Sequence, residues 1–170
     1  MQFKDVIHDR KSVRNFSDRP VSDEDIETIL RAGIQAPSAG NIQPWRFTVV
    51  KSEAARERLN EAVGQRWAAA APAVIVVSLD PRPVNARYGA RGLTLYGIQD
   101  CAAAAENMLL TAVDLGLASC WIGAFDEAKV AAALGLKRPI TPVTLLPIGY
   151  SAQGSGKQSR RPLDEVVSWI

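Results

Sequence analysis

The run Ala73–Leu79 (AVIVVSL) constrains the fold of this chain more than any other segment. Its β-branched and almost wholly apolar composition predicts a β-strand, and the absence of alternating polar residues predicts that both faces of that strand are covered. Shorter strands are expected over 46–50, 119–123 and 143–150. We therefore expect an α/β or α+β sandwich in which helices pack on a sheet.

Several helices are expected around these strands. The segment Ser22–Asp25 (SDED) predicts a helix start, because acidic side chains are stabilised in the first turn of a helix. Further helices are expected over 53–67 and 126–134. By contrast, the two prolines in the segment 80–92 predict a loop without regular structure.

The segment 98–115 predicts the longest helix, and its apolar residues lie nearly all the way round it. Such a helix is buried on more than one side. Four consecutive alanines at 102–105 would let a second helix approach closely, which favours a dimer interface. A central helix wrapped by its own chain explains the pattern equally well. Cys101 and Cys120 are expected in the core, because both have apolar neighbours.

The composition excludes several classes of protein. A chain of 170 residues suits one domain, expected to span 1–170. The net charge of +2 is too small for general nucleic-acid binding, so any basic site must be local. With 2 cysteines and 1 histidine, no metal site, histidine-based catalytic triad or disulfide framework is expected. The charged N-terminus lacks a signal-peptide pattern and no segment suits a membrane helix, so we expect a cytoplasmic protein.

Common nucleotide-binding and hydrolytic motifs are missing from the sequence. The glycine-rich segment 154–156 has neither the spacing of a phosphate-binding P-loop nor the third glycine of a dinucleotide fingerprint. No Gly-x-Ser-x-Gly elbow occurs either. Ordinary hydrolytic chemistry is therefore not expected.

Two clusters of basic residues near the chain ends predict an anion site. Arg10, Ser12 and Arg14 occupy alternate positions, so in an extended segment they point the same way. Near the C-terminus, Arg160 and Arg161 add two guanidinium groups. Arginine forks suit a phosphate, and two separated clusters could close around one. Either cluster alone is more simply interpreted as a solvated surface.

Between the two clusters lies the loop Ala36–Trp45 (APSAGNIQPW), which is rich in turn-forming and small residues. Its small side chains would let a flat polar ligand approach the backbone closely. A plainer interpretation is a connector whose Trp45 covers the core.

Taken together, these segments resemble the nitroreductase family of FMN-dependent oxidoreductases. The matching motifs are RKSVRNF at 10–16 and APSAGNIQPW at 36–45, followed by GAFD at 123–126, LPIGY at 146–150 and RRPL at 160–163. They span nearly the whole chain in the family's order. The resemblance implies an α+β fold, a three-layer α/β/α sandwich with a mixed sheet and helices on both faces. It also implies a homodimer with FMN at its interface and a tail of about 151–170 reaching the partner subunit.

The resemblance further implies roles for individual residues. Arg10 and Ser12 would hold the phosphate and ribityl end of FMN, assisted by Arg160, and Arg14 would face the N1/O2 edge of the flavin ring. A backbone N–H near Gly123 would address flavin N5, so no side chain is implied as a catalytic group. The other implied cofactor contacts are Lys11, Pro37, Ser38, Ala39, Asn41, Gln65, Ile122, Pro147, Ile148, Gly149 and Arg161, with the residues of 37–41 supplied by the other subunit.

The implied activity is hydride transfer from NAD(P)H through flavin N5 to electron-poor acceptors, such as nitroaromatics or quinones, in a ping-pong cycle. A guanidinium near N1/O2 would stabilise the reduced cofactor, and the protein itself would supply position and charge. Two alternatives stay open. One is a specialised flavin reaction on the same scaffold, such as dehalogenation or dehydrogenation of a small metabolite. The other is a flavin-binding module without turnover.

Two departures from the family pattern affect these expectations. Gln158 stands where the family tail often has lysine, and Lys157 is a candidate substitute. The segment between Ala73 and Ile98 is compact, which implies a reduced lid, between Asp80 and Gly97, over the flavin.

Overall fold

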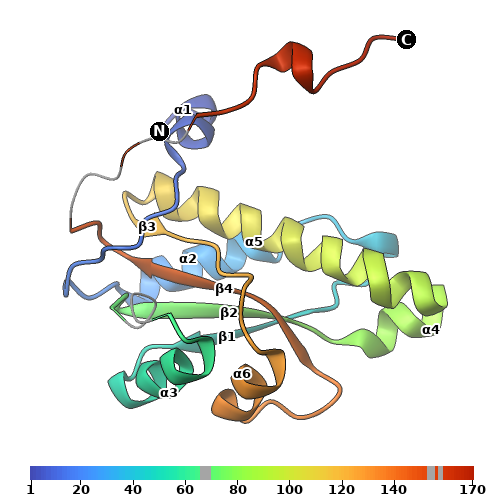
Figure 1. The fold of residues 1–170 in the computed structure, drawn as a ribbon, viewed down its shortest axis with the longest axis horizontal. Coiled ribbons are helices and arrows are strands. Elements are labelled where there is room, and N and C mark those ends of the chain that lie inside the picture. Colours follow the sequence, from blue (N-terminus) through green and yellow to red (C-terminus); the bar gives the residue numbers. More distant parts are fainter. Residues whose placement is uncertain (66–69, 153–155, 157–158) are drawn as a thin grey trace.

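A four-stranded sheet with the order β1-β2-β4-β3 forms the middle layer of the computed structural model (Figure 1). The structure describes residues 1–65, 70–152, 156 and 159–170. The strands are β1 (Trp45–Val50), β2 (Ala73–Leu79), β3 (Ala118–Ser119) and β4 (Thr141–Gly149).

The sheet is antiparallel, so the expected mixed sheet is wrong. β1 pairs with β2, β2 with β4 and β3 with β4, each in antiparallel register. Within the described ranges, parallel pairing is confined to an isolated bridge between Ser12 and Ser119. Strand direction follows the path of each connection, and a helical connection of sufficient length fits either direction. The helices expected between the strands therefore did not determine whether neighbouring strands run parallel or antiparallel. The observed fold is α+β.

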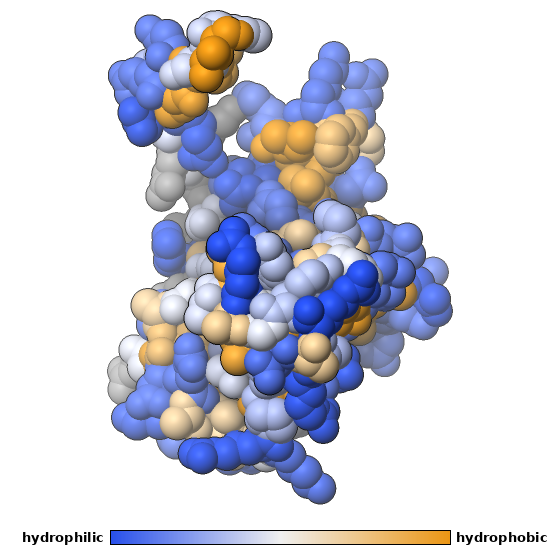
Figure 2. Space-filling model, turned by 90° about the vertical axis from the view of Figure 1, so that its right-hand side faces the viewer, coloured by the Kyte–Doolittle hydropathy of each residue, from blue (hydrophilic) through white to orange (hydrophobic). Residues whose placement is uncertain are grey.

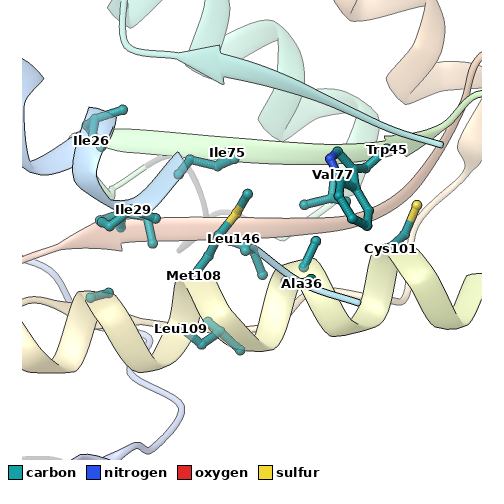
Figure 3. Close-up of a cluster of buried hydrophobic side chains, with 14 of the residues drawn as sticks. Ile26, Ile29, Ala36, Trp45, Ile75, Val77, Cys101, Met108, Leu109 and Leu146 are labelled. Atoms are coloured by element: carbon teal, nitrogen blue, oxygen red, sulfur yellow. The ribbon is translucent and has the colours of Figure 1, made fainter. Parts of the chain in front are cut away.

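Strand β2 has the two-sided burial expected from its composition. Ala73, Ile75 and Val77 belong to the larger core, which also contains apolar residues of α2 and α5 (Figure 3). Val74 and Val76 point the other way, into a second core with residues of α3 and α6. Because side chains alternate along a strand, one strand contributes to both cores.

Helices cover both faces of the sheet, which confirms the three-layer arrangement (Figure 1). α2 and α5 lie on one face, and α3 and α6 lie on the other. The helices are α1 (Phe3–Asp9), α2 (Asp23–Gly33), α3 (Glu53–Val63), α4 (Pro81–Arg91), α5 (Gly97–Asp114) and α6 (Glu127–Leu134), with short helical turns at Ala39–Asn41, Gly92–Tyr96 and Leu163–Glu165.

The start of α2 and the burial of α5 agree with what the sequence predicts. The hydroxyl of Ser22 accepts a hydrogen bond from the N–H of Asp25, 3.0 Å away, and so caps α2. In α5, Ala104 and Ala105 are fully buried within this chain, as the interpretation of a central helix requires. Cys101 and Cys120 are also buried, which confirms their placement in the core.

The segment that follows β2 is helix α4, so the expected loop over 80–92 is wrong. The carboxylate of Asp80 accepts a hydrogen bond from the N–H of Arg82 at 3.2 Å, which caps the helix. Pro81 and Pro83 stand in the first turn, where backbone N–H groups have no partner within the helix. The prolines therefore begin this helix and do not interrupt it.

The C-terminal tail projects from the body of the protein. It leaves the fold beside α1 and runs away from the helical layers (Figure 1). Residues 159–170 are all exposed, and Trp169 retains 93% of its accessible surface. Apolar side chains are visible in the projecting upper part of the molecule (Figure 2). The expectation that the tail reaches a partner subunit stays a prediction, as does a single domain spanning 1–170.

Candidate functional site

The two ends of the chain meet at one pocket. This basic pocket has a volume of about 240 Å³ and is lined by Ile7, His8, Arg10, Lys11, Ser12, Gly156 and Arg160. The expected convergence of the N-terminal and C-terminal basic clusters is therefore present within a single chain.

Local backbone bonds hold the N-terminal half of the basic pocket in place. α1 ends at Asp9, and the N–H of Arg10 donates to the carbonyl of Val6 at 3.0 Å. The chain then runs beside β3, where the N–H of Val13 donates to the carbonyl of Ser119 at 2.9 Å. This extended segment presents Arg10, Lys11 and Ser12 to the pocket.

The basic pocket contains more positive than negative charge. Arg10, Lys11 and Arg160 line it. The nearest carboxylate partner of Arg10 is Glu106 of α5, with 3.9 Å between Nε and Oε1. At that distance the pair orients the guanidinium without a short hydrogen bond. Three cationic side chains, one of them beside Glu106, make a site that favours an anion such as phosphate.

Arg14 and Arg161 do not line the basic pocket. Arg14, the residue after Val13, has an exposed side chain. The family resemblance implies that this side chain faces the flavin ring. Arg161 turns toward the tail, where its Nε donates to Glu165 Oε2 at 3.1 Å. Their roles in cofactor binding stay predictions. Lys157 and Gln158, the residues at the family's lysine position, lie outside the described residues.

The loop over 36–45 has a tightly built backbone. Ser38 Oγ accepts from the N–H of Gln43 at 3.0 Å, and the Gln43 side chain donates to Asn41 Oδ1 at 3.1 Å. Gly40 has φ of +57°, and an added Cβ there would lie 2.6 Å from the hydroxyl of Tyr88. Arg87 of α4 donates to the Gly40 carbonyl at 3.1 Å. Pro37, which precedes these residues, is exposed.

Asp100 attaches this loop to α5. Its Oδ1 accepts a hydrogen bond from the N–H of Ala39 at 3.0 Å, and the residue retains 5% of its surface. Its Oδ2 is buried with no hydrogen-bond partner among the described residues. Burial raises the pKa of the Asp100 carboxyl above its ordinary value, and the bond from Ala39 opposes that rise. Asp100 was not predicted as a site residue, although an acidic group on an otherwise apolar helix was an available signal.

One chain does not bring the loop and the basic pocket together. As far as the structure describes the chain, no residue of 37–41 lines the basic pocket. Their attachment points on α5, Asp100 and Glu106, are six positions apart, or about 9 Å along the helix axis. The expectation that the two parts serve different sites stays a prediction.

The remaining implied contacts lie on and beside β4. Ile148 is fully buried in the larger core, and Pro147 and Gly149 on either side of it are also buried. Ile122 is buried as well, and its N–H donates to the carbonyl of Leu145 at 2.9 Å. Their flavin roles stay predictions.

Gln65 and the turn after Ile122 are neighbours. Gln65 Nε2 donates to the carbonyl of Ala124 at 3.1 Å, next to the exposed Gly123. The structure thus brings together two parts of the implied ring site that are far apart in the sequence. No cluster of metal-ligating side chains occurs in the described part of the chain, and none of its helices is long and apolar enough to cross a membrane.

Comparison with known proteins identifies the family. A model described as the nitroreductase family matches residues 7–73 and 62–150. The chain belongs to the nitroreductase family. A relative from Archaeoglobus fulgidus, named as an NADH dehydrogenase/NAD(P)H nitroreductase, is 40% identical over 151 residues, which cover 85% of this chain and 83% of the relative.

Solved structures of nitroreductase family proteins have the same fold. A protein from Bacteroides thetaiotaomicron named as an NADH dehydrogenase/NAD(P)H nitroreductase has a TM-score of 0.86 at 29% identity, covering 99% of this chain and 97% of that one. A nitroreductase from Exiguobacterium sibiricum, solved in complex with FMN, has a TM-score of 0.92 at 23% identity, covering 100% and 98%. At that identity the second likeness concerns the fold. The resemblance seen in the sequence motifs is confirmed.

Proposed function

We propose that this chain is an FMN-dependent oxidoreductase that uses NAD(P)H to reduce electron-poor acceptors such as nitroaromatics or quinones. The single observation that carries the proposal is the basic pocket, where Arg10, Lys11 and Ser12 meet Arg160 from the other end of the chain. A compact set of cationic side chains and a hydroxyl fits a phosphate monoester. Membership of the nitroreductase family indicates that this phosphate monoester is FMN.

The chain's own residues would divide the work of binding the cofactor. Arg10 and Arg160 hold the phosphate, with Ser12 beside them as a hydroxyl donor. Arg14 would supply a fixed positive charge toward the N1/O2 edge of the flavin, which would favour the reduced form. Gln65 holds the turn containing Gly123, whose backbone N–H would serve the N5 position.

When bound, FMN would supply the hydride-accepting centre, at N5, for transfer from NAD(P)H to an acceptor that binds after NAD(P)⁺ has left. The residues described above position the cofactor and provide charge, and no protein side chain needs to exchange a proton with a substrate. The scarcity of histidine and cysteine is compatible with this division of roles.

A second copy of the chain would complete each site. The loop of residues 37–41 does not line the basic pocket of its own chain, so far as that pocket's lining is described. The tail of residues 159–170 is exposed and has apolar side chains that bury little surface in its own chain. Exposed apolar groups of this kind favour association. In the dimer, the loop would line the flavin ring held by the partner, and the tail would pack on the partner's surface.

The test begins with the purified protein in its native form. The expected result is a yellow protein whose chromophore, released by denaturation, has the mass of FMN. NAD(P)H oxidation should be slow without an acceptor and fast with a nitroaromatic or a quinone. A colourless protein that takes up no FMN would contradict the proposal. A yellow protein that fails to oxidise NAD(P)H with any acceptor would favour a flavin-binding module.

A further inference from the structure

His8, the single histidine of the chain, lines the basic pocket. It lies in the last turn of α1, two positions before the motif that carries the family resemblance. From the sequence alone, a single imidazole argues only against a catalytic triad or a metal site. The structure places it beside Arg10, Lys11 and Arg160, where an anion would bind.

The charges that face His8 oppose one another. Asp9 lies on the same helix, with its Oδ1 3.1 Å from His8 Nδ1. The C-terminal end of α1 adds partial negative charge beside the ring. Arg10, Lys11 and Arg160 repel a further positive charge. On α5, Glu106 offsets part of the charge of Arg10.

An anion in the basic pocket changes this balance in favour of protonation. A phosphate compensates the three cations and attracts the imidazolium directly. An imidazolium carries protons on both ring nitrogens, so it can donate to Asp9 and to a phosphate oxygen at once. We propose that His8, in its protonated form, is a further phosphate contact for FMN, and that cofactor binding is coupled to proton uptake at this ring. This inference rests on the proposed function.

The single histidine permits a direct test by proton NMR. Its ring resonances can be followed from pH 5 to 9 in the cofactor-free protein without overlap from other imidazoles. We expect saturating FMN to move the titration midpoint of His8 upward by at least about 0.5 pH units, because a nearby opposite charge favours the charged form. Riboflavin, which lacks the phosphate, should leave the midpoint unchanged. FMN that binds without moving the midpoint would overturn the inference and leave the proposed function intact.

Affinity measurements provide a second, independent readout. The phosphate of FMN has its own ionisation near pH 6, and a basic pocket prefers the dianion, so the affinity of the wild-type protein alone is ambiguous. The variant His8→Gln removes only the contribution of the imidazole. We expect its Kd for FMN to exceed the wild-type value about 3- to 10-fold at pH 6 and to match it near pH 8.5. The control Lys4→Gln, in the same helix but outside the pocket lining, should show a pH-independent ratio.

The possible outcomes separate the two proposals. A Kd ratio for His8→Gln that is the same at pH 6 and pH 8.5 would contradict the role of His8. Failure of the wild-type protein to bind FMN at any pH would instead contradict the proposed function. A pH-dependent ratio that is abolished when riboflavin replaces FMN supports the inference.

Discussion

Replacement of Arg10 by alanine tests the assignment of the basic pocket most directly. Arg10 is the cation of the pocket with the best-defined surroundings: it follows α1 immediately and has Glu106 beside it. Truncation removes one charge-assisted contact to the cofactor phosphate. It leaves the backbone of the segment in place, because the hydrogen bonds that hold that segment are made by main-chain atoms.

The expected magnitude follows from the exposure of the side chain. A hydrogen bond to a charged group contributes about 1.5–3 kcal/mol, and fully exposed ion pairs contribute about 0.2–1 kcal/mol. The Arg10 side chain is 23% exposed, so we take the lower part of the first range. A loss of about 1.5–2 kcal/mol corresponds to a Kd for FMN that is about 10- to 30-fold higher.

The fold should tolerate this substitution. The Arg10–Glu106 pair is long, at 3.9 Å, and the Glu106 side chain is 50% exposed, so its loss should lower the free energy of unfolding by less than about 1 kcal/mol. Fluorescence titration of the cofactor-free protein with FMN measures the Kd. Arg31→Ala, which removes an exposed ion pair with Glu27 outside the pocket lining, is the matched control. A Kd for Arg10→Ala within threefold of wild type, with the fold intact, would refute the phosphate assignment.

Four further predictions concern assembly, stability and reactivity. Deletion of residues 160–170 should shift the sedimentation coefficient from that of a dimer toward that of a monomer; an unchanged dimer would contradict the role of the tail. Asp80→Asn should lower the free energy of unfolding in urea by about 1–3 kcal/mol at pH 7. Hydrogen bonds from Arg82 hold the pKa of Asp80 below its ordinary value, so this contribution exists above about pH 4 and disappears as the pH falls through the lower folded-state pKa. An equal loss at pH 7 and pH 2.5 would argue against that cause. Asp100→Ala should speed hydrogen exchange at the Ala39 amide, and protection equal to wild type would show that the loop does not depend on this bond. Burial raises the pKa of the Cys101 thiol to about 12, so this cysteine should resist alkylation at pH 8 until the protein is unfolded; fast labelling of the native protein would be inconsistent with its burial.

Elements with a strong local cause were predicted well from the sequence. β2 is almost wholly apolar because it forms part of two cores, and α2 begins where Ser22 caps it. α4 was missed, because its two prolines were interpreted as helix breakers. In the first turn they cost no hydrogen bond, and Asp80 directly before them was the signal for a helix start. The strand directions depend on the path of the connections in space, so the local pattern could not supply them.

The candidate site was predictable to the extent that its residues lie in one motif. The alternate positions of Arg10, Ser12 and Arg14 predicted a shared direction. Arg10 and Ser12 line the basic pocket, but Lys11 between them lines it too and Arg14 does not. The hydrogen bond from Gln65 to the Ala124 carbonyl depends on where the end of α3 lies relative to the turn that contains Ala124. The local sequence does not show that placement. His8 and Asp100 were missed for the same reason. Each lies on a helix in which a polar residue at that position needs no ligand to account for it. The groups that surround each side chain come from segments distant in the sequence.

The attachment of the segment after α1 has a consequence for how the protein accommodates a ligand. That segment joins the sheet through Ser12 and Val13 at β3, the two-residue edge strand, and not at β2, which supports both cores. An outer edge held by few bonds can shift by small amounts while the central strand keeps its register. Entry and departure of a bulky cofactor can therefore proceed at the rim, at a free-energy cost well below that of opening either core.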